Sequence, residues 1–169
     1  MKIVIVSDNH LDTQALTLIR ERHLREADLF IHCGDSQLPF NHPKLEGYLV
    51  VRGNCDFDQN LLNDRVENLT SQDRLFVTHG HLYDVKYSLQ RLYYKACELE
   101  ANIVCYGHSH CIGAEMIEDI LFINPGSVML PRNTREKTYA ILTLTEQWLE
   151  VIFYEVKTGQ RLYQDKFER

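Results

Sequence analysis

Short apolar runs that stop at glycine or at polar residues dominate the first two thirds of the chain. Runs of this kind are typical of strands that are covered on both faces, because neither face meets water. Between the first two runs, Ala15, Leu16 and Ile19 repeat at helical spacing after Asp12 or Thr13, either of which can cap a helix. This β-α-β order predicts parallel strands with a right-handed crossover. The three expected strands cover residues 2–7, 28–33 and 48–52.

The middle of the chain changes its pattern twice. Residues 36–47 are expected to form a loop with one helical turn, since Pro39, Pro43 and Gly47 interrupt them. Residues 66–69 and 75–78 then predict an antiparallel pair of strands. The clearest helical periodicity follows at about 86–100, where Leu89, Leu92, Ala96 and Leu99 mark a buried stripe.

The last third contains short strands separated by turn residues. Residues 113–118 and 121–124 predict a hairpin, and residues 139–144, 149–156 and 161–167 predict an antiparallel meander. The chain has 169 residues without a repeat or an evident linker. We therefore expect one domain that spans residues 1–169.

Composition narrows the class of protein. The chain is 44% hydrophobic and 25% charged, as in ordinary globular proteins, and its net charge of −6 argues against nucleic acid as the main partner. No apolar run approaches the ~20 residues of a membrane span, so no membrane partner is expected. The start of the chain enters a predicted strand without a signal peptide, which leads us to expect a cytoplasmic protein. Five cysteines without a Cys-x-x-Cys pair indicate neither a disulfide framework nor a zinc knot.

Residues that can bind metals follow five of the predicted strands. Each alone has an ordinary structural reading as a cap, a turn residue or a hydrogen-bonded loop histidine. Together they meet at one crevice, because the carboxyl ends of strands in an open α/β sheet lie on one edge. Four histidines, two aspartates and one asparagine are too many for one tetrahedral ion and suit two divalent ions. These residues are Asp8, His10, Asp35, Asn54, His79, His108 and His110.

The ordered set of motifs resembles the calcineurin-like metallophosphoesterases, in particular their small bacterial and archaeal phosphodiesterase branch. The resemblance is carried by Asp8-x-His10, Gly34-Asp35, Gly53-Asn54, His79-Gly80-His81 and Gly107-His108-x-His110, with Gly-Asn-Cys-Asp at 53–56 and Asn-Pro-Gly-Ser at 124–127. It implies an α/β fold, a four-layer α/β/β/α sandwich with two mixed β-sheets. It also implies one ion on Asp8, His10 and His110, a second on Asn54, His79 and His108, and Asp35 as the bridge.

The resemblance implies an enzyme, a metal-dependent phosphodiesterase in which a metal-bridging hydroxide attacks a small phosphoester. Mn²⁺ is the expected ion, and Ni²⁺, Fe²⁺, Co²⁺ and Zn²⁺ remain alternatives. Cys55 occupies the position where many larger members carry the histidine that is thought to protonate the leaving group. The general acid therefore stays open between Asp56, His81 and water, and His81 equally fits hydrogen bonding behind the ligands.

Three other interpretations remain open from the sequence. The fold also resembles a retromer subunit, a non-catalytic scaffold that has lost metal ligands, whereas all seven ligand positions are filled here. A phosphomonoesterase or a nuclease of the same fold is the other enzymatic alternative. The natural substrate and the oligomeric state, a homo-oligomer included, are not determined by these patterns.

Overall fold

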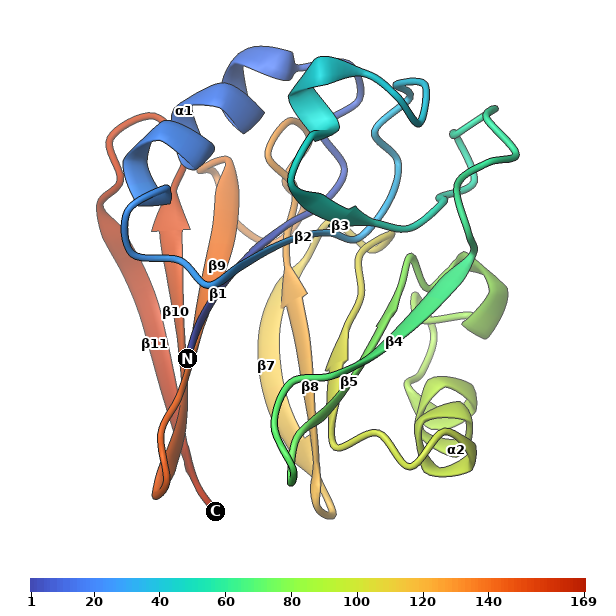
Figure 1. The fold of residues 1–169 in the computed structure, drawn as a ribbon, viewed down its shortest axis with the longest axis vertical. Coiled ribbons are helices and arrows are strands. Elements are labelled where there is room, and N and C mark those ends of the chain that lie inside the picture. The colour runs from blue at the N-terminus through green and yellow to red at the C-terminus, as the bar shows by residue number, and fades with distance from the viewer.

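Two β-sheets stand face to face in the computed structural model, which describes residues 1–169 (Figure 1). The six-stranded sheet has the order β11-β10-β9-β1-β2-β3, and the five-stranded sheet has the order β4-β5-β6-β8-β7. Both sheets are mixed. Their strands are β1 (Lys2–Val6), β2 (Leu29–His32), β3 (Tyr48–Val50), β4 (Asp64–Asn68), β5 (Arg74–Thr78), β6 (Ile103–Cys105), β7 (Ile112–Ile117), β8 (Ile120–Pro125), β9 (Thr138–Leu144), β10 (Trp148–Glu155) and β11 (Arg161–Glu168).

The predicted strands and their pairing are largely confirmed. β1, β2 and β3 run parallel, as the β-α-β pattern indicates, and β9 joins β1 in antiparallel register. The predicted pair β4–β5, the hairpin β7–β8 and the meander β9–β10–β11 are antiparallel. β2 and β3 end earlier than predicted, at His32 and Val50, because the chain leaves the ladder to form the loops of the site described below.

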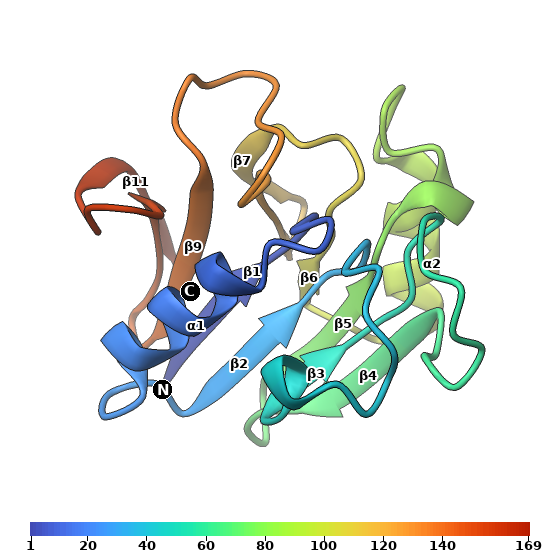
Figure 2. The same ribbon diagram turned by 90° about the horizontal axis from the view of Figure 1, so that it is seen from above.

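One helix covers the outer face of each sheet, and Figure 2 shows α1 and α2 on opposite sides of the molecule. The helix α1 (Thr13–His23) begins after Asp12, whose side chain caps it by accepting the Ala15 backbone N–H. The helix α2 (Gln90–Glu98) packs Leu92 and Ala96 onto the five-stranded sheet. The expected four-layer α/β/β/α sandwich with two mixed β-sheets is thus confirmed.

The second helix is shorter than its periodicity predicts. Residues 86–89 form turns instead, because Asp84 adopts a left-handed conformation and its carbonyl accepts the Tyr87 N–H at 2.9 Å. At the other end Glu100, with φ 54°, stops the helix. The predicted helical turn in the loop 36–47 is confirmed as a 3₁₀ turn, Pro43–Leu45.

The main core lies between the two sheets. Ile3 and Ile31 of one sheet pack with Leu75, Ile103 and Leu121 of the other, and all five side chains are fully buried. Because both sheets share this core, their strand ends are held in fixed positions relative to each other. None of the helices is long and apolar enough to cross a membrane.

Candidate metal centre

The ends of β1, β2, β5 and β6 are tied together by backbone and side-chain hydrogen bonds. Asp8 N–H donates to the Gly34 carbonyl at 3.0 Å, which joins the loops after β1 and β2. Two further bonds cross from one sheet to the other: His79 Nδ1 donates to the Cys33 carbonyl at 2.7 Å, and His108 N–H donates to Asp8 Oδ2 at 3.2 Å. The predicted convergence of strand ends is therefore present in the structure.

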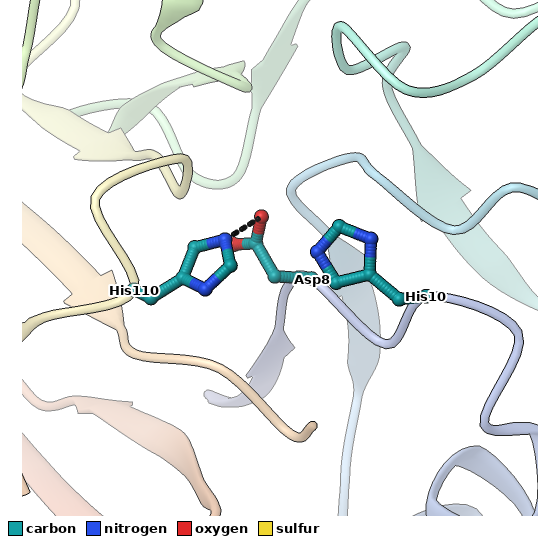
Figure 3. A group of neighbouring side chains, drawn as sticks. All are labelled: Asp8, His10 and His110. Atoms are coloured by element: carbon teal, nitrogen blue, oxygen red, sulfur yellow. Dashed lines mark ion pairs between the residues drawn. The ribbon is translucent and has the colours of Figure 1, made fainter. Parts of the chain in front are cut away.

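Asp8 lies between the rings of His10 and His110, as Figure 3 shows. Nε2 of His110 is 3.1 Å from Asp8 Oδ1, and the two imidazole centroids are 5.4 Å apart. The ligand atoms of these three residues lie within 4.8 Å of one another. They form one group that can hold a metal ion, and it is the group that the resemblance implies for the first ion.

A second group shares Asp8 with the first. Nε2 of His79 lies 3.4 Å from Asp35 Oδ2 and 3.9 Å from Asp8 Oδ1, and all three side chains are buried. The two groups are thus contiguous, because Asp8 belongs to both.

These distances suit ligands that face a common ion. Two donor atoms that each lie ~2.1 Å from one ion stand roughly 3.0–3.4 Å apart at octahedral to tetrahedral angles. The Asp8–His110 and Asp35–His79 separations of 3.1 and 3.4 Å fall in this range. Asp8 Oδ1 nevertheless has no hydrogen-bond partner, so the short contact with His110 lacks the alignment of a hydrogen bond.

Three buried polar atoms at the centre of the site lack partners. They are Asp8 Oδ1, His10 Nε2 and His79 Nε2. A buried polar group without a hydrogen bond costs free energy, so several of them facing one another require an explanation. Divalent cations would satisfy these atoms, one on the side of His10 and one on the side of His79, and this set of nitrogen and oxygen donors fits Mn²⁺, Fe²⁺, Co²⁺, Ni²⁺ or Zn²⁺.

The tautomers of three histidines are fixed by oxygen acceptors. Each Nδ1 faces an oxygen that can only accept, so Nδ1 carries the proton and Nε2 is left for a metal. These acceptors are the Gln37 side-chain amide oxygen for His10 at 3.1 Å, the Cys33 carbonyl for His79 at 2.7 Å and the Leu130 carbonyl for His110 at 2.7 Å.

The site favours positive charge even without an ion. Burial raises the pKa of Asp8, but His110 and His79 lower it by more, and Asp8 stays ionised. Burial likewise opposes ionisation of Asp35, yet His79 lowers the pKa of that carboxyl strongly. In return Asp8 raises the pKa of His110, and Asp35 and Asp8 raise that of His79 against the effect of burial. The two carboxylates thus favour positive charge at the site, which a divalent cation would supply.

The backbone at the site is strained. Ten residues other than glycine have positive φ angles, and five of them belong to the predicted ligand set. Such conformations cost about 1–3 kcal/mol each and persist only where the surroundings enforce them. The five are Asp8, His10, Asp35, His108 and His110, with φ between 40° and 65°.

Two glycines allow the carboxylates to approach the neighbouring loops. A Cβ at position 53 would lie 2.0 Å from Asp35 Oδ1, and a Cβ at position 107 would lie 2.0 Å from the Ser7 hydroxyl and 2.8 Å from Asp8 Oδ2. No side chain fits in either place. Gly53 and Gly107 therefore belong to the site through the space that they leave.

His108 and Asn54 lie at the margin of the site. The ring of His108 is 5.1 Å from that of His79, and burial together with the charge on His79 lowers its pKa to about 4. Asn54 is exposed, and its amide group donates to Cys55 Sγ at 3.2 Å. Neither residue joins the two groups described above, and their assignment as ligands stays a prediction.

Cys55 lies closer to the centre than the sequence indicates. Its Sγ lies within 4.8 Å of ligand atoms of His10 and Asp35, and its backbone N–H donates to Asp35 Oδ1 at 2.7 Å. Burial and the neighbouring Asp35 raise the pKa of the thiol to about 11, so it is neutral at pH 7. Only the position after Gly53-Asn54 could have indicated this proximity from the sequence.

The two candidates for the general acid have different environments. Asp56 is buried, and its carboxylate accepts four hydrogen bonds, from the backbone N–H groups of Asp35, Gly53 and Gln37 and from the Ser36 hydroxyl. This arrangement indicates a residue that holds two loops together, because proton donation would break such bonds.

His81, in contrast, is half-buried, and its ring lies 5.4 Å from that of His79 and 6.1 Å from that of His108. Burial and the charge on His79 lower its pKa. Its Nδ1 has no hydrogen-bond partner. Of the two candidates, His81 has a polar side-chain atom without a hydrogen bond, whereas the Asp56 carboxylate is fully hydrogen-bonded.

Several supporting residues lie behind the ligands; Asn124 and Ser127 belong to the motif at 124–127, whereas nothing in the sequence distinguishes Ser7 and Ser109. Ser7 donates to Asp8 Oδ2 at 2.5 Å, and Ser127 donates to the Asp8 carbonyl at 2.8 Å. Asn124 donates to the Gly107 carbonyl at 3.0 Å and to the Ser109 hydroxyl at 2.9 Å. Their side chains hold the ligand loops in place, as expected for residues behind a metal site.

The fold and the His/Asp clusters define the chain as a metallophosphoesterase with clusters suited to divalent metals. Residues 1–147 match the calcineurin-like phosphoesterase superfamily domain. The chain belongs to this superfamily, as its motifs predict.

Two curated relatives place the chain among small bacterial phosphoesterases. It is 46% identical over 155 residues to the "probable metallophosphoesterase YsnB" of Bacillus subtilis, a match that covers 92% of this chain and 91% of the relative. It is 36% identical over 101 residues to the phosphodiesterase YfcE of Escherichia coli, which covers 56% of this chain and 51% of the relative.

Solved structures show the same fold. A predicted phosphoesterase from Streptococcus pneumoniae superposes with a TM-score of 0.90 at 37% identity, over 99% of this chain and 97% of that one. Vps29 from Entamoeba histolytica, in a complex with Zn²⁺, superposes with a TM-score of 0.75 at 16% identity over 99% of both chains. At this identity Vps29 shares the fold alone.

Proposed function

We propose that this protein is a dinuclear metal-dependent phosphodiesterase that hydrolyses a small phosphoester. The observation that carries the proposal is the inward-facing set of buried donor atoms without partners, on Asp8, His10 and His79. The remaining proposed ligands are Asp35, His110, Asn54 and His108. Asp8, His10 and His110 would hold one ion, Asn54, His79 and His108 the other, and Asp35 would serve both.

Divalent ions at such a site neutralise phosphoryl oxygens and lower the pKa of bound water. The chain prepares the site for them in two ways. Carbonyl and amide oxygens keep Nδ1 of three ligand histidines protonated, so that Nε2 is presented inward. The Ser7 hydroxyl and the Cys55 N–H each occupy one oxygen of Asp8 and Asp35, which leaves the other oxygen free for a cation.

For proton donation to the leaving group we propose His81 over Asp56, with water as the alternative because the lowered pKa of His81 leaves its ring mostly neutral at pH 7. The Asp56 carboxylate is fully engaged with backbone donors, whereas His81 Nδ1 is unpartnered beside two proposed ligands. This assignment predicts that His81→Ala loses more activity on alkyl esters than on aryl esters, since aryl oxides leave without protonation.

We propose phosphodiesters rather than monoesters as substrates, because the chain is similar to YfcE, which is named a phosphodiesterase. Mn²⁺ is the proposed ion. We also propose that residues 1–169 act as one domain, because both sheets share one core, and that the protein works in the cytoplasm.

A metal-reconstituted activity screen tests the proposal. Metal-free protein would be loaded with Mn²⁺, Ni²⁺, Co²⁺, Fe²⁺ or Zn²⁺ and assayed on bis(p-nitrophenyl) phosphate, p-nitrophenyl phosphate and pyrophosphate. We expect two ions per chain and the highest kcat/KM on the diester. Higher turnover of the monoester with two ions bound would contradict the diester preference and leave the metal site intact.

A non-catalytic scaffold remains the alternative from another class. Metal binding alone does not separate it from an enzyme, because Vps29 of the same fold is described in a complex with Zn²⁺. Turnover does: a protein that binds two ions but hydrolyses no phosphoester in the screen would support the scaffold. Cleavage of DNA or RNA above that of small diesters would favour a nuclease, which the net charge of −6 disfavours.

A further inference from the structure

A cleft of about 660 Å³ opens directly beside the proposed metal ligands. His108 and His110 line one end of it. The other walls come from residues 85–89, which precede α2, and from Cys111, Ile112 and Gly113 at the start of β7. A molecule bound at the ligand histidines can therefore extend into this space without crossing the protein core.

The cleft lies on the outer face of the five-stranded sheet. Ile112 and Ala114 pack into the core between the sheets, so Gly113 and Glu115 point to the opposite face. Tyr106 and Val85, which also line the cleft, belong to the cluster beneath α2. The floor of the cleft is thus part of a well-packed layer, which makes it a preformed surface.

Two cations without carboxylate partners stand on its walls. Lys86 and Arg132 line the cleft and take part in no ion pair. The Arg132 backbone N–H donates to the His110 carbonyl at 3.0 Å, which places this residue next to a proposed ligand. Both residues therefore belong to the cleft that His108 and His110 line at one end.

The local charge differs in sign from that of the whole chain. Glu115 is the one carboxylate in the lining, and two cations against one carboxylate leave a local charge of +1 where the chain carries −6. Glu115 lies three residues along β7 from Ile112, or ~10 Å at ~3.3 Å per residue. Arg132 is thus tied to a proposed ligand through its backbone, whereas the carboxylate lies farther along β7.

We propose that this cleft binds the substituent that stays on the phosphorus after hydrolysis. Lys86 and Arg132 then select a substituent that carries a second negative charge. The substrate class is then a phosphodiester with an additional carboxylate or phosphate a few bonds from the scissile phosphorus. The proposal rests on the proposed function and adds the residues that determine specificity.

A series of p-nitrophenyl diesters tests it, because the leaving group stays constant. The retained group would be 3-carboxypropyl, n-butyl or 3-(trimethylammonio)propyl, which differ in charge more than in size. We expect kcat/KM for the anionic ester to exceed that for the butyl ester by about three- to tenfold at low ionic strength, and the cationic ester to be slowest. High salt should reduce these ratios.

Substitutions test whether Lys86 and Arg132 cause the preference for the anionic ester. Lys86→Met with Arg132→Met removes both charges and keeps the aliphatic length, and it should bring the anionic-to-butyl ratio to about one. Glu115→Gln should raise the ratio. The matched control is Lys44→Met with Arg135→Met, two exposed cations outside the cleft, which should leave it unchanged.

Gly113→Leu supplies a steric test that avoids charge. No atom lies within 4 Å of a Cβ built at position 113, so a larger side chain there enters the cleft and not the core. It should lower kcat/KM for the carboxypropyl ester much more than for a methyl ester. An equal effect on both esters would contradict a subsite in this cleft.

Failure of this proposal can be separated from failure of the proposed function. Hydrolysis of all three esters at equal kcat/KM, or selectivity that persists in the Lys86/Arg132 variant, would overturn the subsite and leave the enzyme. If no ester is hydrolysed, binding decides: 3-carboxypropyl methyl phosphate should shift the Gly113 amide resonance saturably in the Zn²⁺-loaded wild type and not in that variant. The absence of a shift in the wild type would refute the subsite.

Discussion

Two parts of the same six-stranded sheet differ in their backbone conformation. The loops after β1 and β2 carry Asp8, His10 and Asp35 in left-handed conformations, whereas no residue other than glycine has a positive φ after Glu118. The strands β9, β10 and β11 form regular antiparallel ladders with a single irregularity between Phe153 and Tyr154. They contribute none of the proposed ligands.

The meander stabilises the fold, whereas the loops after β1 and β2 form the proposed binding site. In the meander β9 and β10 pair along their whole shared length and their inner side chains are buried, so local preference and global fold agree. At the loop edge, buried atoms lack partners and glycines leave room for carboxylates. Strain of this kind persists because the shared core enforces it, and it marks the part of the molecule selected for binding.

The largest expected effect is on the loop side of this comparison. Asp35→Asn keeps the shape of the side chain but removes the carboxylate that would serve both proposed ions, so metal binding and activity should fall together, by about 10³-fold or more in kcat/KM. The metal-free variant should be less stable than the wild type at pH 7, because the lowered pKa of Asp35 means that its carboxylate stabilises the fold, and His79 loses this partner. Metal analysis, kinetics and urea unfolding with and without Mn²⁺ measure this. Full activity with one ion bound would refute the role of Asp35.

The opposite result is expected in the meander. Phe153 is 1% exposed and packs in the core between the sheets, so Phe153→Ala should lower the free energy of unfolding by about 3–5 kcal/mol. The folded fraction should keep the wild-type metal stoichiometry. Urea unfolding and metal analysis at low temperature check both parts. A change in stoichiometry at unchanged stability would show that the two regions are not separable.

The sequence predicted the regular part of the molecule and the ligand-bearing positions for related reasons. Apolar runs such as 103–106 identify buried strands, and a glycine followed by His108 identifies the place where such a strand stops. The sequence pattern predicted too long a helix α2, because the periodicity that includes Leu89 continues into turns that Asp84 initiates.

It could not reveal contacts that exist only after folding. The Leu130 carbonyl reaches His110 across 20 residues, and Gln37 reaches His10 across 27. Neither residue has a composition or spacing that distinguishes it in the sequence. The sequence predicts a list of candidate ligands, which stays a prediction, but not the residues that orient them.

A moderate effect is expected from the residues behind the ligands. Gln37 orients His10 through Nδ1, so Gln37→Ala should weaken Mn²⁺ binding by about 10- to 100-fold with little change in stability. The matched control is Gln14→Ala, on the exposed face of α1. Calorimetric titration of metal-free protein gives both affinities. Equal affinities in the two variants would show that His10 does not need this hydrogen bond.

The smallest effect is expected at Cys55, although its Sγ lies within reach of His10 and Asp35. Its contribution to Asp35 is a backbone N–H bond of 2.7 Å, which Cys55→Ser retains. In the metal-free protein its thiol is neutral at pH 7, since burial and Asp35 raise its pKa to about 11, and the two proposed ions have their ligands without it. We therefore expect Cys55→Ser to bind two ions and to keep kcat/KM within about threefold of the wild type. Kinetics and metal analysis side by side with Asp35→Asn make the test decisive. A loss as deep as that of Asp35→Asn would make the thiol a ligand in the group with His10 and Asp35. Cys55 would then count among the metal ligands and not among the residues that position them.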